Sequence, residues 1–381
     1  MIDVAIAGAG PVGATLALSL ARADLDVTVV EAREAGKPAH DRTLGLSHGT
    51  RLVFERVGAW TPLAATPGAV TPIAAIDVSQ ARGFGSVRLD AAEHALPALG
   101  YVVSYRALQQ VLDDALSRSR VRVTFGNPVR RVGFTPAHGT LEIDATRVVE
   151  ARLAVVADGA ATSIDGIARR RHDYRQVAIV TQVSIDHPHH GVAYERFTPQ
   201  GPVALMPERD HYAVIWTCRR LDADRLLALP DAEFLAALAA HFGPRVRRFT
   251  GVAARRAFPL VLDVARNTTL PHFAVIGSAA QALHPIAAQG FNLGLRDAYD
   301  LARTIVETPR ADLGSPAMLE RYRKRRAIDR GAGIAFTHGL VQLFGNDWPW
   351  LRIPRGLGMM MLDTLPVAKR AFGRAMLFGA R

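Results

Sequence analysis

The sequence is poor in the features that mark secreted and membrane-spanning proteins. Cys218 is the one cysteine among 381 residues, so no intramolecular disulfide can form, which is typical of a reducing compartment. There is no uninterrupted run of 18 or more apolar residues, and this argues against a membrane-spanning helix. The chain enters an apolar segment with no basic stretch before it, so we expect no secretory signal. We therefore expect a cytoplasmic protein.

Acidic residues are scarce relative to basic ones. The formal net charge is +11, and residues 319–381 carry twelve Lys and Arg but four Asp and Glu, so +8 of the charge lies in this C-terminal segment. A segment that is both basic and apolar favours peripheral association with the inner face of a membrane, or with a lipid carrier in a biosynthetic complex. The competing interpretation is that the segment packs onto the rest of the chain. No nucleic-acid-binding motif accompanies the charge, so nucleic acid is not an expected partner.

Metal-binding clusters are missing as well. His187, His189 and His190 form the one histidine group, and they lie in a turn that contains a proline. A solvated loop explains this group better than a metal site does. We therefore expect no metal.

A dinucleotide-binding pattern opens the chain. Residues 2–7 predict a buried parallel strand, residues 8–13 read GAGPVG, and residues 14–23 have the spacing of a helix. A second apolar strand, 27–30, ends at Glu31. A GxGxxG between a strand and a helix, followed about 20 residues later by an acid, is typical of a dinucleotide site.

Each position of this pattern has a physical role. Gly8 allows the tight turn, Gly10 lets the backbone approach a pyrophosphate, and Gly13 lets the helix pack closely on the strand. Glu31 can accept hydrogen bonds from a ribose. Arg42, in a loop further along, either binds a phosphate or is a solvated loop residue.

The remaining patterns predict an α/β protein with an inserted sheet. Residues 153–157 form an apolar strand that ends in Asp158-Gly159, a position at which α/β sheets bind ligands. Spaced strand patterns between residues 177 and 218 predict an antiparallel sheet, and residues 319–344 and 357–378 predict closing helices. The predicted domains are a discontinuous nucleotide-binding domain (1–70, 101–172 and 264–318), a substrate-domain sheet (71–100 and 173–263) and basic, apolar C-terminal helices (319–381).

The densest pattern lies at residues 273–302. An apolar strand leads into a loop of small residues that includes Gly277-Ser278 and passes His284-Pro285. The loop ends in Gln289-Gly290-Phe291-Asn292, after which helical spacing follows. The free N–H groups of a helix start form an anion cradle, and at Gly290 a flat ligand can lie on the backbone. The alternative is a buried strand, loop and helix with no ligand.

With these three segments in order, the chain resembles the flavin-dependent aromatic hydroxylases of the para-hydroxybenzoate hydroxylase fold. GAGPVG with Glu31 is similar to their FAD site, Asp158-Gly159 to their DG motif, and 277–292 to their GD motif and flavin loop. The likeness runs over nearly the whole chain. Three segments are similar to the ubiquinone-biosynthesis hydroxylases, in particular the 2-polyprenyl-6-methoxyphenol hydroxylase branch: AAQALHPIAAQGFNLGLRD (279–297), YERFTPQGPVALMP (194–207) and YRKRRAIDR (322–330).

The resemblance implies an activity as well as an FAD-binding Rossmann-like domain. The implied enzyme is an FAD-dependent monooxygenase that uses NAD(P)H and O2 to hydroxylate the ring of a polyprenylated phenol, through a C4a-hydroperoxide of the flavin. No second GxGxxG follows a strand, which fits transient binding of NAD(P)H. The alternatives are a sister hydroxylase acting at another ring position and a weakly active, FAD-retaining scaffold in a biosynthetic assembly. A homo-oligomer is compatible with each of them.

The resemblance also implies site residues. The implied FAD contacts, which include two arginines, are Gly8, Gly10, Gly13, Glu31, Arg42, Arg106, Asp158, Gly159, Gly277, Ser278, Gln289, Gly290, Phe291 and Asn292. Pro285 would shape the side of the flavin where oxygen reacts. His284 would either polarise or deprotonate the phenol, or fix the loop before Pro285, and the structural role is slightly favoured because a base needs suitable geometry.

Two positions depart from the family pattern. Ser278 stands where the wider family has Asp, and it can form hydrogen bonds but carries no charge. Asp158-Gly159 is followed by Ser163 but not by the family's Arg, which weakens the link of this motif to NAD(P)H binding. The FAD interpretation stands, because the other contact regions are intact.

Overall fold

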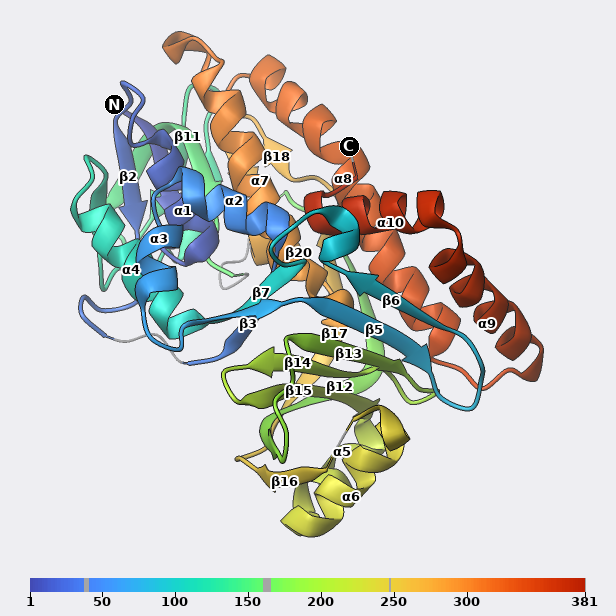
Figure 1. Cartoon of the computed structure of the whole chain (residues 1–381). Helices are drawn as coiled ribbons and strands as arrows, with labels where there is room; N and C mark the ends of the chain where they lie inside the picture. The colour runs from blue at the N-terminus through green and yellow to red at the C-terminus, as the bar shows by residue number, and fades with distance from the viewer. Residues whose placement is uncertain (38–40, 160–165, 247, 381) are drawn as a thin grey trace.

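Residues 1–37, 41–159, 166–246 and 248–380 are described by a computed structural model (Figure 1). Their strands form two large sheets and a small one, and helices cover the outer faces. The helices are α1 (Pro11–Leu20), α2 (His48–Arg56), α3 (Trp60–Ala65), α4 (Tyr105–Ser117), α5 (Arg220–Ala228), α6 (Asp231–Phe242), α7 (Gln289–Val306), α8 (Pro316–Phe344), α9 (Pro349–Thr364) and α10 (Pro366–Phe378).

The first large sheet carries the N-terminal strand near its centre. Its strands lie in the order β18 (Thr269–Leu270), β19 (Phe273–Val275), β11 (Val148–Val156), β1 (Ile2–Ala7), β2 (Val27–Val30) and β8 (Arg122–Thr124). Off this path, β10 (Gly139–Glu142) pairs with β11, and β9 (Arg131–Phe134) pairs with β10. β1 pairs in parallel with both β2 and β11. Val4 and Ile6 pack under helices α1, α4 and α7, whereas Ala5 and Ala7 face the β9–β10 side. Because both faces are covered, β1 is apolar from Val4 to Ala7 instead of alternating, and the buried Asp3 before them pairs with Arg152 and Arg310.

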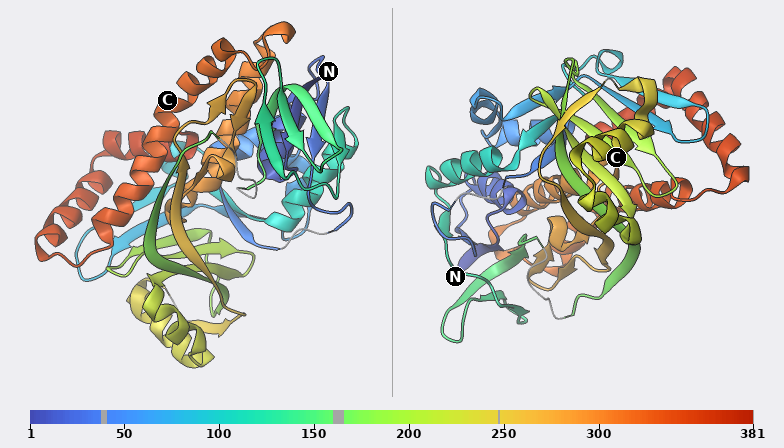
Figure 2. Two further views of the ribbon diagram at one scale, coloured as in Figure 1. Left: turned by 180° about the vertical axis from the view of Figure 1, so that it is seen from behind. Right: turned by 90° about the horizontal axis from the view of Figure 1, so that it is seen from below.

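The second large sheet is mostly antiparallel. Its strands lie in the order β20 (Gln281–Ala282), β17 (Arg256–Ala265), β12 (Arg169–Ile185), β15 (His211–Arg219), β14 (Val203–Glu208), β13 (Val192–Phe197), β5 (Ala75–Gln80) and β6 (Ser86–Asp90), with β16 (Phe249–Val252) beside β12. Only β13 and β5 among these neighbours pair in parallel within the described chain. Helices α5 and α6 cover one face through Leu226 and Phe234, respectively. Seen from behind, β12 and β17 form a long curved ribbon that joins the two halves of the molecule (Figure 2).

A small sheet and the last three helices complete the fold. The small sheet has the order β3 (Thr43–Ser47), β7 (Gly100–Ser104) and β4 (Val70–Ile73), and it lies between the two large sheets (Figure 1). Helix α8 packs on α7, α9 packs on β6, and α10 returns to α2. Over the ranges given above, no helix is long and apolar enough to cross a membrane.

The predicted fold class is confirmed: an α/β protein with an inserted antiparallel sheet and C-terminal helices. The helix expected at 357–378 is instead two helices, because Pro366 cannot continue the hydrogen bonding of α9 and starts α10. The division into domains by residue range stays a prediction. β20, inside the predicted nucleotide-binding range, pairs with β17 of the second sheet, so the chain passes between the sheets repeatedly.

Candidate cofactor and substrate sites

A first cavity of about 330 Å³ lies at the carboxyl ends of β1, β2 and β11. This is the edge at which open α/β sheets bind ligands, because the N-terminus of the following helix faces it. The cavity is lined by Ala7, Gly8, Gly10, Pro11, Val12, Val30, Glu31, Ala32, Arg42, Tyr105, Pro128, Val129, Ala157, Asp158, Gly159, Ser278 and Phe291.

The three glycines of the opening motif lie in three different environments. Gly8 has φ +101°, and a Cβ there would come within 2.8 Å of the Ala157 carbonyl oxygen. A Cβ at Gly13 would come within 2.0 Å of the Gly8 carbonyl oxygen, so any other residue would push α1 away from β1. Above Gly10 the nearest atom is the Tyr105 hydroxyl at 4.0 Å, which leaves open space over the backbone. A turn, a close helix and an open backbone together fit a bound pyrophosphate.

Polar side chains border the same cavity from separate segments. Glu31 follows β2 directly, and its carboxylate accepts hydrogen bonds from the backbone N–H groups of Ala9 and Arg33. Ser278 is exposed and lines the cavity at the position where the wider family has an acid. The Arg42 guanidinium lies 4.3 Å from the centre of the Tyr105 ring. With Asp158 also in its wall, the cavity therefore offers two acidic side chains and one basic side chain beside an open helix start.

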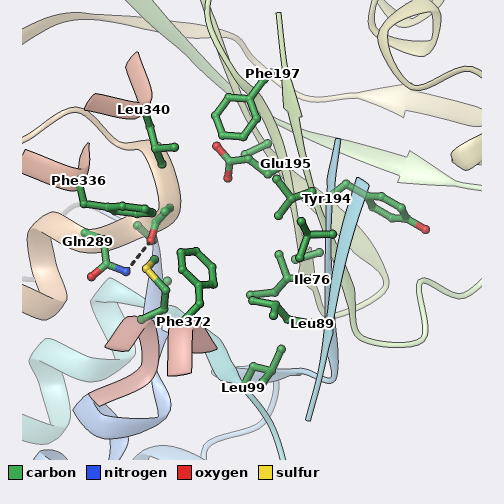
Figure 3. Close-up of a pocket in the computed structure, with 18 of the residues that line it drawn as sticks. Ile76, Leu89, Leu99, Tyr194, Glu195, Phe197, Gln289, Phe336, Leu340 and Phe372 are labelled. Carbon is green, nitrogen blue, oxygen red and sulfur yellow. Dashed lines mark hydrogen bonds between the residues drawn. The ribbon is translucent and has the colours of Figure 1, made fainter. Parts of the chain in front are cut away.

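A second cavity of about 440 Å³ lies between the second sheet and the C-terminal helices (Figure 3). Strands β5, β6, β13 and β14 form one side, and α8, α9 and α10 form the other. The wall is mainly apolar, and its members include Ile76, Val78, Val87, Leu89, Leu99, Tyr194, Glu195, Phe197, Gln289, Phe336, Leu340, Phe344, Arg355, Met359, Phe372 and Leu377. Such a cavity suits an apolar ligand that meets a few polar groups at one end.

The loop between β19 and α7 borders both cavities. Ser278 and Phe291 face the first cavity, whereas Pro285, Ala287 and Gln289 face the second. Ala287 (φ 55°) and Ala288 (φ 49°) both have left-handed backbone conformations, which residues with a side chain rarely adopt. A ligand that reaches from one cavity toward the other would run along this loop.

Asn292 fixes this loop to the neighbouring small sheet. Its Oδ1 accepts hydrogen bonds from the Ser47 N–H (2.8 Å) and the Thr50 hydroxyl (2.7 Å). Its Nδ2 donates to the carbonyl oxygens of Ala288 (2.7 Å) and Gly45 (3.1 Å). All four hydrogen-bonding positions of the amide are thereby used within the protein, so the side chain holds the loop in place.

A buried ion network lies behind the same loop. Asp297 of α7 accepts hydrogen bonds from the Gly277 N–H (3.2 Å), the Gln281 amide (2.5 Å) and Arg326 of α8 (2.8 Å). Arg326 also contacts Asp300 (3.1 Å) and Asp329 (2.6 Å). The network therefore connects the loop backbone to α7 and α8.

His284 lies in the loop but outside the wall of either cavity. Its ring is fully buried, Nδ1 accepts from the Ile286 N–H at 3.2 Å, and its edge packs on the Tyr174 ring. Burial lowers the pKa of His284 to about 4, so the ring is neutral near pH 7. These contacts fit the loop-fixing role, and the acid–base role for this residue stays a prediction.

The predicted site residues fall into three groups. Those in the wall of the first cavity are Gly8, Gly10, Glu31, Arg42, Asp158, Gly159, Ser278 and Phe291, and those in the wall of the second are Pro285, Gln289 and Asn292. Gly13, Arg106, Gly277, His284 and Gly290 line neither. Arg106 is exposed on the first turn of α4, and its neighbour Tyr105 borders the first cavity instead.

Glu195 was not predicted as a site residue, yet it borders the second cavity. Burial raises the pKa of its carboxyl to about 7, and a hydrogen bond from the Ala287 backbone N–H opposes that rise. Its Oε1 is buried without a hydrogen-bond partner in the described residues. The sequence signal was available: on β13, Ala193, Glu195 and Phe197 share one face, and an acid interrupts two apolar residues.

Comparison with known protein families gives a match over most of the chain. The model described as "FAD binding domain" matches residues 1–332. The ubiquinone hydroxylase UbiL of Rhodospirillum rubrum is 33% identical, over 98% of this chain and 88% of the relative. The 3-demethoxyubiquinol 3-hydroxylase of Escherichia coli is 31% identical, over 97% of this chain and 96% of the relative.

Solved structures resemble the fold at lower sequence identity. The p-nitrophenol 4-monooxygenase PnpA of Pseudomonas putida superposes with a TM-score of 0.78 at 18% identity, over 100% of this chain and 99% of that chain. PqsL of Pseudomonas aeruginosa, in complex with 2-aminobenzoylacetate, gives a TM-score of 0.76 at 20% identity, over 94% of this chain and 99% of that chain. At this identity the likeness concerns the fold alone.

Proposed function

Because this chain belongs to the FAD binding domain family, we propose that it is an FAD-dependent monooxygenase that hydroxylates the ring of a prenylated phenol in ubiquinone biosynthesis. The proposed substrate is 2-polyprenyl-6-methoxyphenol, and the proposed co-substrates are NAD(P)H and O2. Relatives named as ubiquinone hydroxylases, at 33% and 31% identity over nearly the full chain, support the reaction class.

The observation that carries the proposal is the loop shared by the two cavities. The glycine-lined cavity has the features of a dinucleotide site, the apolar cavity has those of a lipid-like aromatic site, and Ser278 to Phe291 borders both. A flavin extending along this loop from the first cavity would meet a ring held in the second. Ring hydroxylation by a flavin needs this juxtaposition.

The residues of the first cavity fit FAD. When bound, FAD supplies the redox chemistry that passes electrons from NAD(P)H to O2. The open backbone over Gly10 and the start of α1 would receive the pyrophosphate, and Glu31 would accept hydrogen bonds from the ribose. Ser278 would hydrogen-bond to the cofactor without adding a third acidic side chain to a wall that already holds Glu31 and Asp158.

The second cavity would orient the substrate and exclude water. The phenol ring would lie beside Pro285 and Ala287, where the loop turns. The first units of the prenyl tail would lie between β6 and α9, against Leu89 and Met359. Burying apolar surface there contributes roughly 25 cal/mol per Å² to binding, so the tail would supply much of the affinity.

One assay tests the proposal directly. The holoenzyme is supplied with NAD(P)H, O2 and 2-geranyl-6-methoxyphenol, and the product is identified by mass and by NMR. We expect phenol-stimulated NAD(P)H oxidation together with a ring-hydroxylated product. Hydroxylation at a different ring position would indicate the sister reaction, which the name of the Escherichia coli relative makes the second candidate. Absence of flavin reduction under all conditions would reject the enzyme and favour a scaffold.

The C-terminal helices have features that support both of the roles considered for them from the sequence. Their inner face packs onto the second cavity through Phe344, Met359 and Leu377. Their outer side leaves large apolar residues exposed, namely Trp348, Trp350, Ile353, Leu357, Met360, Met361, Leu365 and Val367. With the +8 charge of this segment, the outer side suits an anionic lipid surface, from which a prenylated phenol would enter the cavity.

A further inference from the structure

Few polar groups of the second cavity have hydrogen-bonding capacity left for a ligand. The Ser47 hydroxyl caps α2 by accepting from the Thr50 N–H, and the Asn292 amide is fully used. Gln289 donates one amide hydrogen to the Ala287 carbonyl oxygen at 3.2 Å. The Glu195 carboxyl has one oxygen beside the Ala287 N–H and another without a partner in the described residues. Buried polar atoms of this kind are uncommon and call for an explanation.

Glu195 also differs from the other ionisable groups of this wall. The Tyr194 ring turns away from the cavity toward Tyr212 and Phe242. The terminal nitrogens of the Arg355 guanidinium donate to the backbone and side chain of Asn346, and its Nε, a donor that cannot accept a proton, is buried without a partner in the described residues. The Glu195 carboxyl points toward the side of the cavity where Phe336 and Gln289 lie (Figure 3). Its neighbour Arg196 is on the opposite face of β13, near Asp77 and Arg245. No ion pair therefore neutralises the Glu195 carboxylate within the described chain.

The position of Glu195 places a proton acceptor at the reacting end of the cavity. Its contact with Ala287 sets it against the loop that borders the first cavity, next to Pro285. We propose that Glu195 is the catalytic base that accepts the hydroxyl proton of the phenol. This inference rests on the proposed function, because it assumes that a phenol occupies the second cavity.

The proton transfer makes the ring more reactive, and it needs no further reactant. The phenol O–H bond breaks, an O–H bond forms on the Glu195 carboxylate, and the electron pair stays on the phenol oxygen and spreads into the ring. No electrons leave the substrate in this step; O2 is reduced with electrons from NAD(P)H, as the proposed function requires. A pKa near 7 is close to the optimum for a base at neutral pH, and such bases contribute about 10²- to 10⁴-fold to the rate.

The test compares Glu195→Gln and Glu195→Leu with a control, Glu233→Gln, which removes an exposed carboxyl on α6. Gln can still hydrogen-bond to the phenol but cannot take its proton. We expect Glu195→Gln to retain FAD and KM, to lose about 100-fold or more in kcat for the hydroxylated product, and to continue oxidising NAD(P)H. The wild-type kcat/KM should rise with pH through about 7, and this rise should be absent from Glu195→Gln.

A binding measurement separates this inference from the proposed function. The dissociation constant of 2-geranyl-6-methoxyphenol, followed by the flavin absorbance of the holoenzyme, should increase about tenfold in Glu195→Leu, because a hydrogen bond to a charged group is lost. If phenol binding depends on Glu195 but the wild-type enzyme forms no hydroxylated product, the proposed function is rejected while Glu195 remains a phenol-binding residue. A Glu195→Gln variant that hydroxylates within about threefold of wild type, or keeps the pH dependence, would overturn the role of Glu195. If Glu195→Gln loses FAD, Glu195→Asp, which keeps a carboxyl group, replaces it in the test. A rise of kcat/KM with pH in Glu195→Asp supports the role of Glu195 as base, and a flat profile rejects it.

Discussion

At Gly13 a single added methyl group would collide with the turn before α1. The Cβ would lie 2.0 Å from the Gly8 carbonyl oxygen, so α1 or the turn must move. We expect Gly13→Ala to lose most of its bound FAD, because the backbone over Gly10 would no longer match a pyrophosphate. The absorbance ratio of flavin to protein in the purified enzyme measures this.

The matched control is Gly331→Ala in α8, where an added Cβ has no atom within 4 Å. Replacing glycine in an exposed helix should stabilise the protein by up to about 1 kcal/mol and leave the flavin content unchanged. Equal flavin retention in both variants would contradict the account of Gly13.

The side chains of His284 and Glu195 should give opposite contributions to the pH dependence of stability. Burial lowers the pKa of His284 to about 4, so its contribution is complete above pH 6.5 and is lost as the pH falls toward 4. Burial raises the pKa of Glu195 to about 7, so its contribution is complete below pH 4.5 and is lost as the pH rises toward 7. Between about pH 4.5 and 6.5 the two slopes oppose each other, each by up to about 1.4 kcal/mol per pH unit.

Variants that change one of the two residues should therefore show each pH dependence separately, because the two oppose each other in the wild-type protein. Relative to wild type, Glu195→Gln should lose stability as the solution becomes more acidic, and His284→Gln should gain it. Urea unfolding at several pH values across this window measures both effects. If the free energy of unfolding of each variant changes with pH in the same way as that of the wild type, the assigned pKa shifts are contradicted.

At the scale of elements, α7 and α8 are joined by charges that lie almost entirely out of water. Arg326 is 3% exposed and contacts Asp297, Asp300 and Asp329. We expect Arg326→Met to lower the free energy of unfolding by about 3–5 kcal/mol, because buried carboxylates lose their counter-charge. Arg323→Met, which breaks an exposed pair with Glu320, should change it by less than about 1 kcal/mol. Chemical denaturation of both variants tests the difference.

The outer side of α9 allows a second prediction at this scale. Trp348 and Trp350 are 53% and 67% exposed, and their rings stack 5.5 Å apart. We expect the double variant Trp348→Ser/Trp350→Ser to sediment severalfold less with vesicles containing phosphatidylglycerol, while its flavin content stays unchanged.

Leu221→Ser supplies the comparison, since Leu221 is 94% exposed on α5, which covers the second sheet far from α9. Vesicle binding that responds equally to both changes would point to general surface hydrophobicity. Binding that responds to neither would leave a lipid-carrying protein as the partner to examine.

Across the whole molecule, the sequence predicted the residues whose positions are fixed by a single chain segment better than those fixed by contacts between distant segments. The positions of Gly8, Gly10 and Glu31 follow from one strand–turn–helix–strand unit, so spacing alone located them at the first cavity. Arg106 and Tyr105 are adjacent, and only the turn of α4 decides which of them faces that cavity. The place of the Glu195 side chain in the second cavity depends on the register of β13 and on a loop about 90 residues further along the chain. A one-residue slip of the strand would turn this side chain to the opposite face of the sheet.

The loop that borders both cavities would also couple the proposed ligands thermodynamically. If a phenol packs against a loop ordered by FAD, each ligand must raise the affinity for the other by the same factor. A tight-binding phenol would then slow the escape of FAD from variants that hold it poorly, such as those altered at Ser278. A lipophilic phenol that cannot be hydroxylated would therefore act as a chemical chaperone, restoring cofactor occupancy from the opposite side of the loop.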